Sequence, residues 1–185
     1  MLTQNMTEFA ATIKAHAAAD LIEQGKYYDE KTGRGCFIGC LAHGNDIDLI
    51  ATKYGLPMPL TRLLEHVFER LDADNARAFF AAIPDAIGGD GRDLGRVHWA
   101  FLGDTLRRMP PQPTDIQAVI DPVIEGMDRL ARGEDWPEAA AMAAAEAAEA
   151  AAMAAVAALS AARAAARSDE IIRQRDALLR LIREA

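Results

Sequence analysis

The sequence has little cysteine, no excess of basic residues and few aromatic side chains. It contains 2 cysteines in 185 residues, and they stand so close together that a bridge between them would close only a trivial loop. The chain has 20 basic residues against 28 acidic ones, so its formal net charge is −8 and its surface as a whole repels nucleic-acid phosphates. These features exclude a disulfide scaffold, disfavour conventional DNA binding and are typical of a reducing compartment.

Long hydrophobic runs are also missing. Glu8 and Lys14 interrupt the N-terminal region where a signal peptide would be uninterrupted. The longest uncharged run of the alanine-rich tract, Ala150 to Ala162, is shorter than the roughly 20 residues that cross a bilayer. We therefore expect a soluble, cytoplasmic protein that does not insert into membranes.

Hydrophobic spacing predicts an all-α fold with a compact helical body. Apolar residues recur every four positions between Thr7 and Gln24, and at spacings of three and four between Leu60 and Leu71. Residues 25–33 combine two tyrosines with a polar, glycine-containing turn, which predicts a small N-terminal hairpin. No other stretch alternates with the period of a strand.

Capping and breaking residues divide the helical pattern further. Asn45 or Asp46 is placed to cap a short helix that ends near Tyr54. Pro84 is expected to stop a helix that begins near residue 72, and Pro122 to kink or split a later one.

The composition changes abruptly after Gly133. Alanine, the strongest helix former, occupies most positions from Ala139 to Arg167, and the other residues form one stripe of period 3.5. We predict a globular body over residues 1–135 and an arm over residues 136–185, in which a long alanine-rich helix is followed by a terminal helix packed back on it. The stripe also supports a homodimer through these C-terminal helices as an alternative hypothesis.

Both cysteines lie in "GRGCFIGCLAHG", residues 33–44. On a helix, Cys36, Cys40 and His43 share one face, which is a pattern typical of metal ligands. Along a helix, Cys36 and His43 are separated by about 10 Å, which is too far for both side chains to bind one ion. This set is therefore kept only as a weak alternative. We expect no metal and no cofactor. A nucleophilic Cys36 at a helix N-terminus is a further alternative.

A packing role accounts for more residues of this motif than a metal or thiol site does. Gly35 and Gly39 have the spacing at which small residues let another backbone approach a helix. The surrounding apolar residues predict a buried helix, and we expect the alanine-rich helix to be its partner, with both cysteines as small buried side chains.

Other charged residues admit simple interpretations. The loop "GGDGRD", residues 88–93, lacks the features of a phosphate or calcium loop and is interpreted as a flexible connection. Glu65 and Glu69 share a helix face with arginines nearby and are interpreted as a solvated charged surface. Arginines beside glycine loops offer an alternative phosphate-binding set: Arg34, Arg92 and Arg96.

Acidic residues are concentrated between Gln112 and Asp135. We define Asp121, Glu125 and Asp128 as the acidic ridge and predict that it binds a basic protein surface, such as one that normally holds nucleic acid.

The order of segments resembles small bacteriophage and prophage accessory proteins. The resemblance rests on "GRGCFIGCLAHG", "KYGLPMPLTRLLEHVFERL", "FFAAIP", "DLGRVHWAFLGDTL" and, after the alanine tract, "RQRDALLRLI". It implies a phage-type accessory protein, and no catalytic residue is carried over because that group has no assigned activity.

Together these features favour a non-enzymatic inhibitor of a host protein, such as a CRISPR component of antiviral defence, acting in the host cytoplasm. The alternatives are a protein that sequesters a small molecule or nucleotide, and a thiol or metal protein centred on Cys36 and Cys40.

Overall fold

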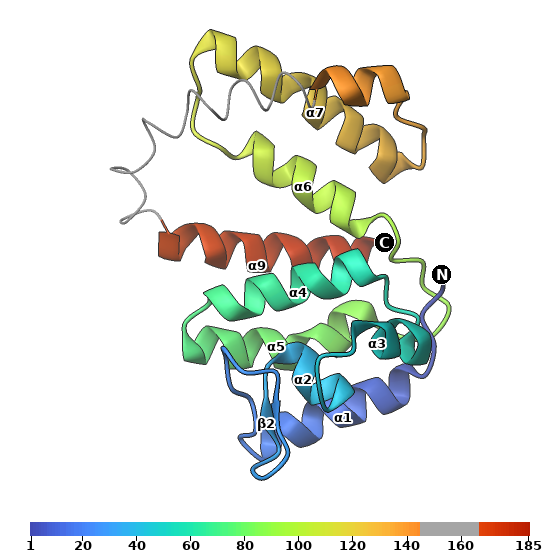
Figure 1. Ribbon diagram of the computed structural model, residues 1–185, viewed down its shortest axis with the longest axis vertical. Helices are drawn as coiled ribbons and strands as arrows, with labels where there is room; N and C mark the ends of the chain where they lie inside the picture. The colour runs from blue at the N-terminus through green and yellow to red at the C-terminus, as the bar shows by residue number, and fades with distance from the viewer. Residues whose placement is uncertain (145–166) are drawn as a thin grey trace. The chain divides into compact units, whose positions relative to one another are not determined.

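The computed structural model describes residues 1–144 and 167–185 of the chain (Figure 1). These residues belong to two compact units: unit 1 comprises Met1–Gly95 and Ile171–Ala185, and unit 2 comprises Arg96–Glu170. The described part is helical apart from one small sheet, short bridges and loops, which confirms the predicted all-α class. The division predicted between residues 135 and 136 falls inside unit 2, and the end of the chain belongs to unit 1.

Unit 1 begins with a helix and the predicted hairpin. Helix α1 (Met6–Ala18) precedes the strands β1 (Tyr28–Asp29) and β2 (Arg34–Gly35), which pair antiparallel. The remaining helices that lie wholly in unit 1 follow in chain order: α2 (Phe37–Ala42), α3 (Ile47–Tyr54), α4 (Met58–Arg70) and α5 (Ala73–Ile87).

Local signals set the ends of α3. The Asp46 side chain accepts a hydrogen bond from the Leu49 N–H at 3.0 Å, which satisfies one of the free donors at the helix start. Gly55 ends the helix with φ 66°, and a β-carbon at this position would lie 2.0 Å from the Leu2 carbonyl oxygen. Glycine is required here both by the backbone conformation and by the close approach of the N-terminal segment.

The prediction that Pro84 stops a helix is wrong, and Pro122 does not split its helix. Helix α5 continues through Pro84 to Ile87, and α7 (Thr114–Arg132) continues through Pro122. A proline removes one helical N–H donor and crowds the preceding turn. In α5 the proline and the apolar residues around it are buried, and this burial outweighs the local cost.

Aromatic rings from five helices fill the core of unit 1. Phe9, Phe37, Tyr54, Phe68 and Phe80 are all fully buried. The Phe37 and Phe80 ring centroids lie 6.1 Å apart, and those of Phe9 and Tyr54 lie 5.2 Å apart, both in edge-on arrangements that aromatic pairs prefer. These contacts join the short helices of the first half of the chain into one core.

Helix α9 (Arg167–Glu184) continues into unit 1 and packs there, whereas the predicted packing of this terminal helix on the alanine-rich helix falls on residues outside the described part of the chain. Its buried side chains are Ile171, Ala177, Leu178, Leu179 and Ile182. The Arg175 guanidinium donates to the Asn75 side chain at 2.5 Å near the start of α5, and the Ile182 carbonyl accepts from Arg92, just beyond the end of α5. The two helices therefore run in the same direction (Figure 1).

Unit 2 is built on α6 (Val97–Arg107) and α7. The Arg107 guanidinium forms an ion pair with Asp128 across these helices. After α7 the chain turns at Gly133, and Trp136 packs so closely on α7 that a β-carbon on Gly126 would lie 2.1 Å from the indole ring. Among the residues described in α7, only Gly126 is buried.

The alanine-rich segment is described only at its edges. Residues 138–144 are helical, whereas most of the predicted alanine-rich helix and its stripe, including the proposed dimer contact, lies outside the described residues. Of the helices that are described, none has both the length and the hydropathy that a membrane span requires.

Candidate functional site

The glycines of the cysteine motif lie directly against the backbone of Tyr27. A β-carbon would lie 2.3 Å from the Tyr27 carbonyl oxygen if placed on Gly35, and 1.2 Å from it if placed on Gly39. The Cys36 N–H donates to the Lys26 carbonyl at 2.8 Å in the same region. The absence of side chains at Gly35 and Gly39 thus lets another backbone segment approach closely. The segment that does so is the loop before β1.

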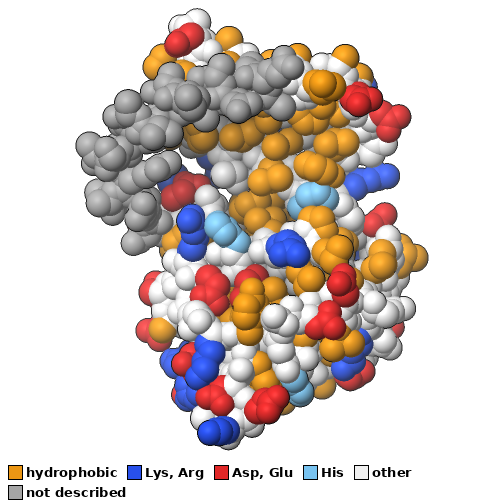
Figure 2. All heavy atoms as spheres, in the orientation of Figure 1, with side chains coloured by type: hydrophobic (Ala, Val, Ile, Leu, Met, Phe, Trp, Pro, Cys, Tyr) orange, Lys and Arg blue, Asp and Glu red, His pale blue; other side chains and the backbone are white. Residues whose placement is uncertain are grey.

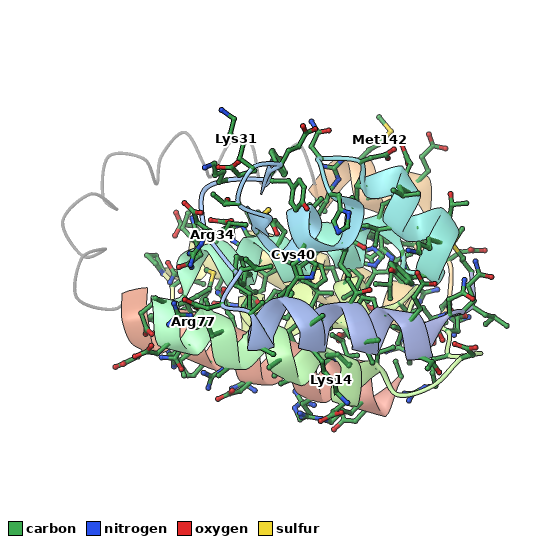
Figure 3. The ribbon with its side chains drawn as sticks, turned by 90° about the horizontal axis from the view of Figure 1, so that it is seen from below. Lys14, Lys31, Arg34, Cys40, Arg77 and Met142 are labelled. Atoms are coloured by element: carbon green, nitrogen blue, oxygen red, sulfur yellow. The ribbon has the colours of Figure 1, made fainter. Side chains whose placement is uncertain are left out.

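The structure does not bring Cys36, Cys40 and His43 together as one ligand set. The Cys40 thiol, whose position Figure 3 shows, donates to the Gly35 carbonyl at 3.3 Å. The His43 ring stacks on Tyr28 with the centroids 4.9 Å apart, and lies 5.8 Å from the His16 ring. His43 ends α2 in the left-handed region with φ 50°, which directs its ring to the hairpin.

Cys36 is grouped with two carboxylates of α4. One potential ligand atom from each of Cys36, Glu65 and Glu69 lies within 4.8 Å of the other two. The Glu65 carboxylate accepts a hydrogen bond from the Ile38 N–H at 3.2 Å, and the Glu69 carboxylate accepts one from the Gly25 N–H at 2.8 Å. Both glutamates are partly buried, so their interpretation as a solvated charged surface is wrong.

The surroundings of this cluster raise the pKa of Glu65 and of the Cys36 thiol. Burial raises the pKa of Glu65, and the nearby charge of Glu69 raises it further, although hydrogen bonds from Cys36 and from α2 oppose these effects. Burial is also the main reason why the pKa of the Cys36 thiol lies far above its usual range, with Glu65 adding to the shift. Burial raises the pKa of Cys40 to about 12.

Sequence spacing alone did not reveal this cluster. Glu65 and Glu69 lie one turn apart on α4, and the pattern shows only that they share a face. That this face meets Cys36 depends on how α2 packs on α4, which is a contact between residues distant in the chain. The available signal was the position of Glu65 directly beside the buried Leu64 in the apolar stripe.

The three arginines of the alternative phosphate set each contact protein groups. Arg34 pairs with Asp20 at 3.4 Å, and Asp20 also pairs with Arg77 at 3.0 Å; both arginines are labelled in Figure 3. Arg92 donates to carbonyls at the ends of α5 and α9, and Arg96 donates to the Arg132 carbonyl at the end of α7. Arg92 and Arg96 thus stabilise helix C-termini, and they belong to different units.

The loop over residues 88–93 is an ordered clamp on the N-terminal segment, which corrects its interpretation as a flexible connection. The Thr3 N–H donates to the Arg92 carbonyl at 2.9 Å, and the Thr3 hydroxyl donates to the Gly89 carbonyl at 3.0 Å. The Asp90 carboxylate accepts from the Met6 N–H at 2.8 Å, so it caps α1 from a distant part of the sequence. This explains how the N-terminus of unit 1 is fixed.

The acidic ridge lies along α7, where its members have different surroundings. Asp121 and Glu125 are exposed, and Asp121 accepts a hydrogen bond from the Gln117 side chain one turn earlier at 2.6 Å. Asp128 is partly buried and forms its ion pair with Arg107. Two of the three carboxylates are therefore presented to solvent, while the third joins α7 to α6.

Apolar side chains are also exposed in unit 2. Leu102 on α6 is 36% exposed, Met109 after α6 is 39% exposed and Met142 is 57% exposed. Along α7 the apolar residues remain only partly buried: Ile116, Val119, Ile120, Val123, Ile124, Met127 and Leu130. Figure 2 shows hydrophobic side chains gathered over α6 and α7.

Comparison of the chain with protein-family models, with curated protein sequences and with solved structures gives no match.

Proposed function

We propose that this protein acts by binding another protein, without catalysis of its own, through a surface formed by α7, by Leu102 of α6 and by Met109, which follows α6. The main support is the presence, in one small unit, of exposed apolar side chains and exposed carboxylates. Leu102 and Met109 are 36% and 39% exposed, and Asp121 and Glu125 are exposed on α7. We call these four residues the α7 surface.

The two kinds of side chain have complementary roles in an interface. Apolar groups that leave water on association supply affinity, and gathered exposed apolar residues mark interaction sites. Carboxylates at the rim attract a basic partner and increase the rate of association. The partner that fits the α7 surface is therefore a protein with a basic surface that also offers apolar contacts.

The two thiols support binding over thiol chemistry. Cys36 and Cys40 are buried, and burial raises the pKa of both thiols, that of Cys40 to about 12. The thiolate is the reactive form of cysteine, and at neutral pH both groups carry their proton. This setting favours a structural role for the thiols over that of a nucleophile.

The resemblance to phage accessory proteins supports a specific biological role for this binding. In that role the protein inhibits a host component of antiviral defence. A CRISPR effector is a suitable target because it holds nucleic acid in a positively charged channel. An acidic helix that occupies part of such a channel would compete with the nucleic acid for the same basic side chains.

The proposal is tested by affinity capture from a bacterial lysate with quantitative mass spectrometry. The test variant combines Asp121→Lys with Glu125→Lys, and Asp128 is left unchanged because it pairs with Arg107. The control variant combines Glu30→Lys with Asp85→Lys, two exposed acids of unit 1. Both variants change the net charge by the same amount.

We expect the wild type and the control variant to retain the same host protein and the test variant to lose it, while circular dichroism shows equal folding of all three. Retention of that protein by the test variant would remove the α7 surface from consideration. Loss from both variants would show that net charge, and no particular surface, governs capture.

A further inference from the structure

A second, independent feature lies in unit 1, where a thiol and two carboxylates meet. Cys36 comes from the start of α2, and Glu65 and Glu69 come from one face of α4; a potential ligand atom of each lies within 4.8 Å of the others. Cys36 is only 1% exposed, whereas the two glutamates are partly exposed. The cluster therefore has a buried end at sulphur and an accessible end at the carboxylates.

Backbone groups from outside α4 hold both carboxylates in place. The Ile38 N–H donates to Oε2 of Glu65 at 3.2 Å, and the Gly25 N–H donates to Oε2 of Glu69 at 2.8 Å. Each carboxylate has a second oxygen, Oε1, which can serve as a ligand while Oε2 keeps its backbone contact. Hydrogen bonds of this kind orient metal ligands and increase the affinity of metal sites.

The charge of the cluster is not balanced by a basic side chain. Within residues 1–144 and 167–185, neither Glu65 nor Glu69 takes part in an ion pair. Glu65 and Glu69 lie one turn apart on α4 with ligand atoms within 4.8 Å, so their negative charges repel each other when no cation lies between them. A divalent cation would reverse this repulsion.

We propose that Cys36, Glu65 and Glu69 bind a divalent transition-metal ion, with zinc the best fit, a site that goes beyond the proposed binding function. Zinc accepts both thiolate and carboxylate ligands, whereas calcium and magnesium prefer oxygen ligands alone. In a tetrahedral zinc site, sulphur and oxygen ligands lie roughly 3.5 Å apart. The present separations extend to 4.8 Å, so binding of zinc requires the glutamate side chains to rotate toward Cys36.

Binding changes the protonation of the cluster in a defined way. The Cys36 S–H bond breaks, the sulphur keeps the electron pair and bonds to zinc, and the proton is released to solvent. The three protein groups leave the fourth position of a tetrahedral ion for a water molecule or a group from a partner. This site differs from the set Cys36, Cys40 and His43, which the structure does not bring together.

The site is tested on the full chain, freed of metal with a chelator, by competition for zinc against a chromophoric indicator. Glu69→Gln is the test variant because the amide oxygen can still accept from Gly25 while the charge is lost. Glu23→Gln, at a partly exposed glutamate of the same unit, is the control. We expect Glu69→Gln to weaken zinc binding by about tenfold or more and Glu23→Gln to leave it unchanged.

Cobalt identifies the sulphur ligand. Cobalt added to the metal-free protein is expected to produce a thiolate-to-metal charge-transfer band that persists in Cys40→Ser and disappears in Cys36→Ser. Absence of the band in the wild type, or zinc binding equal in wild type and Glu69→Gln, would overturn the proposal. Loss of zinc binding in His43→Ala with retention in Glu69→Gln would assign the metal to the histidine pair and overturn it as well.

Discussion

The carbonyl oxygen of Tyr27 lies 1.2 Å from the position that a β-carbon on Gly39 would occupy. The loop before β1 and the helix α2 are therefore in direct backbone contact, and only glycine permits this contact. Because Cys36 caps the start of α2 and Cys40 directly follows Gly39 within it, the contact also fixes the position of both thiols. The packing of α2 consequently determines the geometry of the whole cysteine motif.

Gly39→Ala is expected to destabilise the protein by more than about 3 kcal/mol, because the methyl group cannot fit without displacing the Tyr27 backbone. Gly44→Ala is the matched control, since the nearest atom to its β-carbon is 4.0 Å away, and we expect a change within about 1 kcal/mol. Urea unfolding followed by circular dichroism measures both. Equal stability of the two variants would contradict the described packing of α2.

The two thiols are expected to resist labelling in the native, metal-free protein. Cys36 is 1% exposed and Cys40 is 0% exposed, and burial raises the pKa of both, so access and thiolate formation are both suppressed. A thiol reagent applied near pH 8 should modify both cysteines at the rate of unfolding, and immediately in denaturant. Fast modification of either cysteine without denaturant would contradict the burial of the two thiols.

Stability should decline at alkaline pH because of Cys40. Its folded pKa is about 12 against an ordinary value of 9.0, so between these values the unfolded chain loses its proton first. The resulting stability is complete below pH 9 and is lost as the pH rises toward 12. Between pH 8 and pH 10 we expect the wild type to lose about 1 kcal/mol more than Cys40→Ala, as measured by urea unfolding; parallel losses would refute this assignment.

Arg92 is expected to hold the terminal helix on unit 1. Its guanidinium donates to the Ile182 and Arg183 carbonyls at 3.3 and 2.9 Å, and to the Ile87 carbonyl at 3.3 Å. Arg92→Ala should cost about 1–3 kcal/mol and accelerate hydrogen exchange in α9 more than in α1. Arg183→Ala, which removes an exposed side chain, is the control. Unchanged exchange in α9 of the Arg92 variant would contradict the capping role.

The predicted ends of α3 and the predicted hairpin rest on local signals and are confirmed. Asp46 caps α3, Gly55 ends it, and the turn after Tyr28 forms the hairpin, because each depends on a few consecutive residues. The all-α class follows from apolar spacing for the same reason. The prediction that Pro84 ends its helix is wrong. The tendency of proline to break a helix is outweighed in α5 by the burial of Pro84 and its apolar neighbours, and that burial depends on the rest of the fold.

The candidate site depended on contacts that no local pattern encodes. Glu65 meets Cys36 across 29 positions of sequence, and Asp90 caps α1 across 84 positions. Spacing shows which residues share a helix face, whereas only packing shows what that face contacts. For this reason the Gly35 and Gly39 row was correctly interpreted as a point of close approach, while Tyr27 was not identified as the residue that approaches it.

Binding through the α7 surface is tested most directly by the dissociation constant for the captured host protein. It is measured by calorimetry for the wild type, for Asp121→Lys with Glu125→Lys, and for Glu30→Lys with Asp85→Lys. We predict that the α7 variant binds at least about tenfold more weakly, because like charges then face the basic partner, and that the unit 1 variant binds as the wild type does. Equal dissociation constants for all three proteins would contradict the proposed function.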